Sequence, residues 1–325
     1  MSGRLPERAG GSLRRGPPLK PTVIAPTTYL NRLRVCVGHG WRFAERHRLE
    51  DRSSGSERLL ILIAGHKELL WPWTLDRVSR HVPSDLDVCL VTPGVDLPKL
   101  ADLAREHGWS YLATRGGHVS VAQNLALRAH PDARYVFKVD EDVFVPQRFF
   151  ESLFDGYLRV KEEAEFSLGF CAPILNVNGF SYVDYLDALG QAEAYRERFG
   201  TLRRASDGIP VHHDGNAAVW LWERGLPVEK TAAEISKRPF RFSIVPHRFS
   251  IGAILFERDL WEGMNGFKRL QRSPGLGEDE QHICVECLSR SRIMAVLQNV
   301  YAGHFAFGPQ QPAMEAAFGS RLSEF

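Results

Sequence analysis

The amino-acid sequence predicts an α/β fold in which helices flank a mostly parallel sheet. Short apolar runs alternate with amphipathic stretches through the first half of the chain, and the loops between them are short. Strands that alternate with helices in this way pair in parallel, because each helix returns the chain to the same edge of the sheet. Ligands of such folds bind at the carboxyl ends of the strands.

Four apolar runs between residues 57 and 150 define the first predicted strands. The first covers Leu59–Ala64 and stops at Gly65, and the second covers Val88–Val91 before a Pro-Gly turn. A short third strand and a Gly-Gly loop lie within 110–133, and the fourth strand lies within "RYVFKVDEDVFVP", residues 134–146. Amphipathic helices follow the first three strands, and one of them is expected over 97–107, closed by a glycine.

The alternation breaks after residue 169, and the sequence predicts an insertion over residues 171–245. The insertion contains an expected helix at Tyr182–Phe199, a polar loop and an aromatic patch, "VWLWERG". A β-rich segment at 249–259 follows, and a last strand is expected at Ile293–Val300. We therefore expect one domain over 57–312, with halves at 57–150 and 246–312, a leader at 1–56 and a tail at 313–325.

The composition is that of an ordinary globular protein, but the charge is distributed unevenly. The 325 residues carry a formal net charge of +2, which gives no reason to expect a nucleic-acid partner. The leader is basic and rich in glycine and proline, so we expect it to be largely disordered. It lacks the apolar segment of a secretory signal, and no apolar run reaches the roughly 18 residues of a membrane span. We expect a cytoplasmic protein whose basic leader allows peripheral contact with the inner membrane face.

The cysteines are odd in number and lie in apolar contexts, at Cys36, Cys89, Cys171, Cys284 and Cys287. This pattern indicates reduced, buried thiols in the cytosol rather than a disulfide framework. The last two form a lone Cys-x-x-Cys without a second ligand pair, which argues against a zinc site.

Three consecutive carboxylates end the fourth predicted strand. Side chains alternate along a strand, so Lys138, Asp140 and Asp142 share one face while Glu141 points to the other. Two carboxylates at the carboxyl edge of a parallel sheet suit a hard divalent cation such as Mg²⁺ or Mn²⁺. Such a cation would compensate their repulsion and would neutralise a diphosphate leaving group. The alternative is a solvated acidic turn, which is common after strands.

The stretch "YVFKVDEDVFV" resembles the Asp-x-Asp strand of metal-dependent nucleotide-sugar glycosyltransferases with the GT-A fold. It is similar to the forms of family 2 and of β-1,3-galactosyltransferase-like enzymes. The resemblance implies a Rossmann-like three-layer sandwich, with a nucleotide-binding half at 57–150 and an acceptor or catalytic half at 246–312. It also implies Mn²⁺ or Mg²⁺ as cofactor, with Asp142 as a metal ligand and Asp140 near the ribose or the metal.

A second stretch, residues 250–283, resembles the acceptor half of inverting enzymes with this fold. It contains a small-residue strand, an "NGF" turn and a "GED" that opens a helix. The resemblance implies that Asp279 is the general base for the acceptor hydroxyl, that Glu278 binds the acceptor, and that the reaction inverts the anomeric carbon. The alternative is a structural role, because the helix dipole stabilises carboxylates in the first turn.

Other residues receive roles from the same resemblance. It implies that His304, which we place after the last strand, is an additional metal ligand, and the alternative is an ordinary histidine without a ligand. The expected nucleotide contacts are Ala64, His66, Asp96, Arg115, Gly117 and Asn124, together with Asp140. Asp96 is also explained as a helix cap. Gln123 stands where the family usually has arginine, which weakens any diphosphate contact inferred there.

The insertion contributes an aromatic pair and two adjacent histidines. Trp220 and Trp222 share one face if the chain is extended, so we expect them to bind the acceptor, with core packing as the alternative. Adjacent histidines in "VHHDG" point in different directions along a strand, so we expect a loop cap there rather than a metal site.

Together these observations predict transfer of a sugar from a nucleotide-diphosphate donor, UDP-linked by the resemblance, to a hydroxyl of a glycan, lipid or protein. Two other classes stay open. A sugar-phosphate nucleotidyltransferase shares the layout and the metal, but usually has a Gly-rich basic segment after the first strand, which "AGHKELLWPW" lacks. A non-catalytic glycan-binding protein on the same scaffold would not need both acid clusters.

Overall fold

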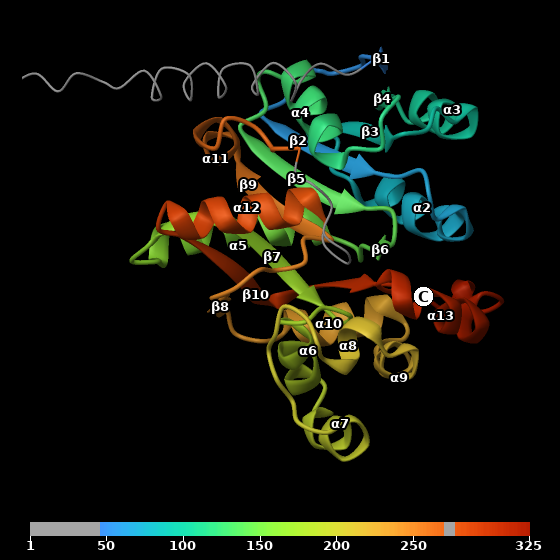
Figure 1. Cartoon of the computed structure of the whole chain (residues 1–325), viewed down its shortest axis with the longest axis vertical. Helices are drawn as coiled ribbons and strands as arrows, with labels where there is room; N and C mark the ends of the chain where they lie inside the picture. The colour runs from blue at the N-terminus through green and yellow to red at the C-terminus, as the bar shows by residue number, and fades with distance from the viewer. Residues whose placement is uncertain (1–45, 270–276) are drawn as a thin grey trace, which may run out of the picture. The chain divides into compact units, whose positions relative to one another are not determined.

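The structure of the chain is a computed structural model that describes residues 46–269 and 277–325. These residues form a mixed sheet of ten strands, ordered β1-β4-β3-β2-β5-β9-β7-β10-β6, with β8 beside β10 (Figure 1). Helices connect most of the strands along the chain. The predicted α/β class is therefore confirmed.

Four parallel strands form the first half of the sheet, as the apolar runs predict. They are β2 (Arg58–Ile63), β3 (Asp87–Pro93), β4 (Ser110–Thr114) and β5 (Tyr135–Asp140). β2 lies between β3 and β5, so that Leu60 is opposite Val88 on one side and Phe137 on the other. Such strands are nearly continuous in apolar residues because both faces of the sheet are covered.

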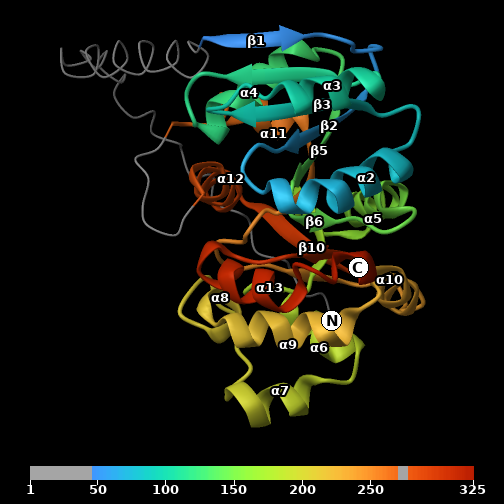
Figure 2. The same cartoon turned by 90° about the vertical axis from the view of Figure 1, so that its right-hand side faces the viewer.

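Helices on both faces give the predicted three layers. One face of β2 shares a hydrophobic core with α2 (Trp71–His81), α3 (Pro98–Glu106) and α5 (Phe149–Glu163). The other face shares a core with α4 (Val119–Ala129), α11 (Arg258–Gly263) and α12 (Glu278–Ser289). Figure 2 shows α2 and α12 on opposite sides of the strands. A short helix, η1 (Glu68–Leu70), leads into α2.

The second half of the sheet brings another carboxyl end to the same edge. β9 (Ala253–Glu257) is antiparallel to β5 and to β7 (Ser167–Leu175), and β10 (Arg292–His304) is parallel to β7. β10 therefore runs in the same direction as β2 to β5. The short strands β6 (Val143–Phe144) and β8 (Phe242–Ile244) pair with β10. His304 is the final residue of β10, and not a residue beyond the strand as the sequence predicted.

The predicted insertion begins inside a core strand, since β7 extends to Leu175. After β7 the chain forms α6 (Tyr182–Ala188), α7 (Ala192–Phe199), α8 (Pro210–His213), α9 (Gly215–Gly225) and α10 (Val228–Ser236). These helices gather at one end of the sheet, together with α13 (Gln311–Phe318) (Figures 1 and 2). The single helix predicted over Tyr182–Phe199 is wrong, because Gly190 adopts a left-handed φ of 65° between α6 and α7.

Both expected flanking segments contribute to the fold. β1 (His47–Glu50) pairs antiparallel with β4, so the end of the predicted leader belongs to the sheet, whereas residues 1–45 lie outside the described part. The expected tail contains most of α13 and the short helix η3 (Leu322–Glu324), and another short helix, η2 (Gly308–Gln310), precedes α13. The ring of Phe325 lies 4.4 Å from that of Trp222, between centroids. No helix of the described ranges is long and apolar enough to cross a membrane.

We predict that Phe325→Ala lowers the free energy of unfolding by about 3 kcal/mol, because the side chain is 6% exposed and its loss leaves a cavity beside Trp222. Phe166→Ala is the matched control. Phe166 is 56% exposed, so its removal is expected to change the free energy by less than about 0.5 kcal/mol. Urea denaturation followed by tryptophan fluorescence measures both values. Equal stabilities of the two variants would contradict a core position for the C-terminal residue.

Candidate functional site

The carboxyl ends of β2, β3, β4, β5 and β10 meet at one edge of the sheet. A cavity of about 1110 Å³ opens there, which we call the large cavity; its lining includes Asp140, Asp142, Asp279 and His304. A small cavity of about 550 Å³ lies over the ends of β2, β3 and β4, and shares His66 and other residues with the large one. The two adjoining cavities have the position expected of a ligand site in an α/β fold.

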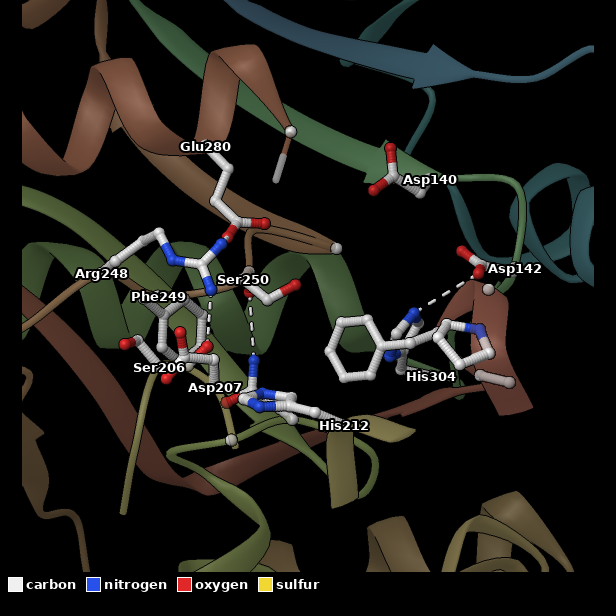
Figure 3. Close-up of a pocket in the computed structure, with 18 of the residues that line it drawn as sticks. Asp140, Asp142, Ser206, Asp207, His212, Arg248, Phe249, Ser250, Glu280 and His304 are labelled. Atoms are coloured by element: carbon white, nitrogen blue, oxygen red, sulfur yellow. Dashed lines mark hydrogen bonds and ion pairs between the residues drawn. The ribbon is translucent and has the colours of Figure 1, made fainter. Parts of the chain in front are cut away.

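Asp142 and His304 are brought together by strand pairing. The chain leaves β5 at Asp140, turns, and enters β6, whose Val143 is opposite His304 at the end of β10. The Nε2 atom of His304 lies 3.3 Å from Oδ2 of Asp142 (Figure 3). The Nδ1 atom of the same ring lies 2.6 Å from the carbonyl oxygen of Val177 and donates its hydrogen there. Because Nδ1 is engaged by that carbonyl, Nε2 is the ring nitrogen that faces Asp142 and the one that would bind a metal here.

The ammonium group of Lys67 forms an ion pair with the same Oδ2 atom of Asp142. Burial alone would raise the pKa of Asp142, but the charges of Lys67 and His304 outweigh it and hold the pKa below its usual range. Burial also opposes the charge of Lys67, and the attraction to Asp142 nevertheless raises the pKa of the lysine. Because Asp142 is only 4% exposed, the alternative of a solvated acidic turn is wrong for this residue.

Asp140 has a lysine partner of its own. The ammonium of Lys138 lies 2.6 Å from Oδ2 of Asp140 and 2.8 Å from the carbonyl oxygen of Ile251. Burial raises the pKa of Asp140 to about 6, with Lys138 acting in the opposite direction and Asp142 adding to the increase. The side chain of Asp140 is 32% exposed, and it lines the large cavity. Asp140 and Asp142 thus reach one cavity, as predicted, although a turn rather than a continuous strand separates them.

Glu141 fixes the loop after β2. Its carboxylate accepts hydrogen bonds from the backbone N–H of Gly65 at 2.9 Å and of His66 at 3.0 Å, and from the indole of Trp71. The loop that carries Lys67 is therefore anchored through its backbone. Glu141 thus has partners of its own, although it lines the large cavity together with Asp140 and Asp142 rather than facing away from it as the sequence predicted.

Three acidic residues open α12, which confirms the predicted place of Glu278 and Asp279 in the first helical turn. Oδ2 of Asp279 accepts a hydrogen bond of 2.7 Å from the side-chain amide of Gln123. Oε1 of Glu278 accepts one of 3.2 Å from the backbone N–H of Ser120. Both carboxylates are thus held by α4. Gln123, noted in the sequence only as a departure from the family, orients the carboxylate of Asp279.

The third acid, Glu280, pairs with Arg248 from the segment after β8. The guanidinium lies 2.6 Å from Oε1 of Glu280 and also donates to the carbonyl oxygen of Ser206. Burial raises the pKa of Glu280 to about 7, although Arg248 acts in the opposite direction. Figure 3 shows this pair across the large cavity from Asp142 and His304. Sequence reasoning missed both residues, because the acid run was interpreted only up to Asp279 and Arg248 lies in no motif.

The expected nucleotide contacts divide into two groups. His66, Arg115 and Gly117 line the small cavity. Gly94 lies against Gly117 so closely that a Cβ atom at position 94 would be 2.9 Å from its Cα, and its φ is +81°. The loops after β3 and β4 therefore meet because residue 94 has no side chain.

The other expected nucleotide contacts are not available as predicted. Ala64 is fully buried and its N–H bonds to the carbonyl of Val91. Asn124 is also fully buried, and its side-chain oxygen accepts hydrogen bonds of 2.8 Å from the indole of Trp261 and the N–H of Phe267. Its predicted contact with the diphosphate is therefore wrong. Asp96 is outside the described lining of both cavities and pairs with Arg48 at 3.1 Å.

The prediction that Trp220 and Trp222 bind the acceptor is wrong as well. Both belong to helix α9 rather than to an extended segment, and they are 3% and 0% exposed. The indole N–H of Trp222 lies 3.0 Å from the carbonyl of His304 and 2.9 Å from that of Phe305. The alternative of core packing is correct, and Trp222 supports the backbone that carries His304.

The segment with the two adjacent histidines forms a helix cap and part of the cavity lining. Asp214 caps α9 by accepting a 2.8 Å hydrogen bond from the N–H of Asn216, as expected of a cap. His212 lines the large cavity, and burial lowers its pKa to about 4.

Within 46–269 and 277–325 no group of three His, Cys, Asp or Glu side chains is placed to hold a metal. Asp142 and His304 fit Mn²⁺ or Mg²⁺ as a pair, because such ions accept few protein ligands when phosphates supply the others.

The raised pKa of Glu280 predicts a cost to stability that grows with pH. A carboxyl whose pKa rises on folding contributes most to stability below its unfolded pKa, and this contribution is lost as the pH increases to about 7. We predict that Glu280→Gln gains stability relative to the wild type by about 1 kcal/mol or more between roughly pH 5 and pH 8. Thermal unfolding across this range measures the change.

Glu286→Gln, on the same helix, is the matched control for this prediction. Burial opposes the charge of Glu286, but hydrogen bonds from Arg290 and Lys268 outweigh it and lower the pKa. Its stabilising contribution is therefore complete above roughly pH 5 and stays constant up to pH 8. The same pH trend in both variants would contradict the environment described for Glu280.

The chain is similar to known proteins in its fold rather than in its sequence. No protein-family model and no curated protein sequence matches the chain. Solved structures with similar folds include S. aureus TarS 1-349, at 10% identity and a TM-score of 0.45, where the match covers 77% of this chain and 60% of that one. The same fragment with UDP-GlcNAc matches at 11% identity and a TM-score of 0.43, over 75% of this chain and 57% of that one.

A further similar structure is the mannosyltransferase PcManGT from Pyrobaculum calidifontis, in complex with GDP-Man and Mn²⁺. It matches at 14% identity and a TM-score of 0.43, over 91% of this chain and 79% of that one. This chain spans less than two thirds of the TarS fragment. Similarity at this level assigns no substrate or residue role to the chain, so its chemistry rests on its own side chains.

Proposed function

We propose that this chain is a glycosyltransferase that moves a sugar from a nucleoside-diphosphate donor, UDP-linked, to an acceptor hydroxyl with inversion. The observation that carries the proposal is the shared lining of the large cavity, which brings together Asp142 from the turn after β5, Asp279 from the start of α12 and His304 from the end of β10. Ligands for a cation and a base for a hydroxyl are the two chemical functions that this reaction requires.

The donor extends across both cavities in this proposal. We assign the nucleoside to the small cavity, which is lined by His66, Arg115 and Gly117. The diphosphate and the sugar then occupy the large cavity, beside Asp140. Asp142 and His304 would hold Mn²⁺ or Mg²⁺ there. A divalent cation at this position neutralises the charge that develops on the departing diphosphate.

Asp279 acts as the general base in this proposal. Its Oδ2 accepts the hydrogen bond from Gln123, which leaves Oδ1 for the proton of the acceptor hydroxyl. As that proton moves to Asp279, the hydroxyl oxygen forms its bond to the anomeric carbon, and the bond from this carbon to the diphosphate breaks. Glu278 lines the same cavity and is assigned to the acceptor. Burial opposes the charge of Lys138, but the charges of Asp140 and Asp279 outweigh it and raise the pKa of the lysine, which keeps a cation close to this base.

We predict that Asp279→Asn lowers turnover by about 100-fold or more, because the amide does not accept the proton. Nucleotide binding in the presence of Mn²⁺ is expected to stay within about twofold of the wild type, since Asp279 is not assigned to the donor. Donor hydrolysis with Mn²⁺, over UDP-linked and GDP-linked sugars, measures turnover without a known acceptor, and calorimetry measures binding. Asp102→Asn, an exposed carboxylate on α3, is the control expected to leave both unchanged.

The outcomes separate the three classes of function. Full turnover by Asp279→Asn would exclude it as the base without excluding the transferase. The absence of Mn²⁺-dependent binding of UDP or GDP would contradict the proposed function. Formation of a nucleotide sugar from nucleoside triphosphate and sugar 1-phosphate would identify a nucleotidyltransferase. Glycan binding without turnover of any donor would identify a binding protein.

A further inference from the structure

Each of the two aspartates at the large cavity already has a lysine as counter-ion, but the two lysines differ. The side chain of Lys138 is 3% exposed and its ammonium also bonds to the carbonyl of Ile251, so it is fixed within the sheet. The side chain of Lys67 is 24% exposed and lines the large cavity. Its ammonium also lies 3.5 Å from the carbonyl oxygen of Ala306, a long and therefore weak hydrogen bond. Of the two cations, Lys67 is the one that a ligand in the cavity can displace.

The ammonium of Lys67 contacts the carboxylate that a metal ion held by Asp142 and His304 would require. It contacts Oδ2 of Asp142, the same oxygen that lies 3.3 Å from Nε2 of His304. A divalent cation held by Asp142 and His304 needs that carboxylate, and two cations at one oxygen repel each other. Binding of the metal therefore requires the ammonium to leave.

A displaced Lys67 needs a new anionic partner near the cavity. Its backbone cannot follow a ligand, because Glu141 holds the N–H groups of Gly65 and His66 just before it. Its four-carbon side chain can change rotamer while the loop stays in place. A diphosphate between the two cavities supplies the negative charge that such a displaced ammonium lacks, so loss of the contact with Asp142 is compensated only when the diphosphate is present.

We propose that Lys67 is a resident counter-ion that competes with the divalent cation for Asp142 and makes tight metal binding depend on the nucleoside diphosphate. This inference rests on the proposed function, because it needs the metal position assigned there. The metal alone binds weakly, because its binding separates the ammonium of Lys67 from Asp142 and provides no new anionic partner. The metal and the diphosphate together bind cooperatively, and each increases the affinity for the other by the same factor.

Titration with Mn²⁺ alone, followed by the electron paramagnetic resonance signal of the free ion, tests the competition without any turnover. We predict that Lys67→Met binds Mn²⁺ on the order of tenfold more tightly than the wild type, a factor within the usual range of coupling between sites. Lys67→Arg keeps the positive charge and is expected to remain near the wild type. Lys99→Met is the matched control, because Lys99 is 65% exposed and pairs with Glu68 outside the cavity.

Repeating the titration with UDP and with GDP tests the coupling. In the wild type the nucleotide is expected to tighten Mn²⁺ binding strongly. In Lys67→Met the nucleotide is expected to tighten Mn²⁺ binding less than in the wild type. The reduction is expected to equal about the factor by which this variant gains affinity for Mn²⁺ alone. Asp142→Asn, which removes the proposed ligand, is expected to abolish tight Mn²⁺ binding both with and without the Lys67→Met change. Thermal unfolding verifies that each variant is folded, and Lys67→Gln replaces Lys67→Met if the latter is not.

The possible failures are distinguishable. If Asp142→Asn abolishes Mn²⁺ binding but removal of the Lys67 charge leaves the affinity for Mn²⁺ unchanged or weaker, the competition is excluded and the proposed metal site stands. An equal gain in Lys67→Arg and Lys67→Met would also exclude it, because the charge would then not matter. If Mn²⁺ binding does not depend on Asp142, the proposed site and the inference are both wrong.

Discussion

The concentration of negative charge at one edge of the sheet is the constraint on which the site depends. Apart from the exposed Asp207, six carboxylates line the large cavity, three from the end of β5 and the turn after it and three from the start of α12: Asp140, Glu141, Asp142, Glu278, Asp279 and Glu280. Buried carboxylates that lack partners are costly. Each of these accepts at least one hydrogen bond, from lysine, arginine, an amide side chain or the backbone. The surrounding loops and helices are placed by these partners.

The second half of the chain supplies much of this compensation and support. The segment before β9 contributes Arg248 to Glu280 and a backbone carbonyl to Lys138. Helix α9 contributes Trp222, which bonds to the backbone carbonyl of His304. The C-terminal Phe325 packs on that indole. The helices after β7 are therefore part of the structure that positions the pair of Asp142 and His304, and not an appendage to the first half of the sheet.

The parts of this structure that depend on local pattern could be predicted from the sequence, and the parts that depend on long-range pairing could not. Continuous apolar runs predict β2 to β5, since strands covered on both faces need apolar residues at every position. The run that ends in Asp140 and Asp142 likewise predicts carboxylates at the cavity. The ion pair of Lys67 with Asp142 joins residues 75 positions apart, and no local pattern indicates it. The two tryptophans, Trp220 and Trp222, share one face only if the chain is extended, and aromatic residues two apart do not distinguish a strand from a buried helix.

We propose that Asp142 and His304 form a metal site, and that the ammonium of Lys67 balances the charge of Asp142 until the metal binds together with a nucleotide. A crystal structure with Mn²⁺ and UDP, with anomalous scattering recorded at the manganese edge, tests it most directly. The account predicts an anomalous peak within bonding distance of both Asp142 and His304, and the ammonium of Lys67 moved from Asp142 to a phosphate oxygen. A bound nucleotide with Lys67 still paired to Asp142, or manganese bound elsewhere in the cavity, would contradict the account.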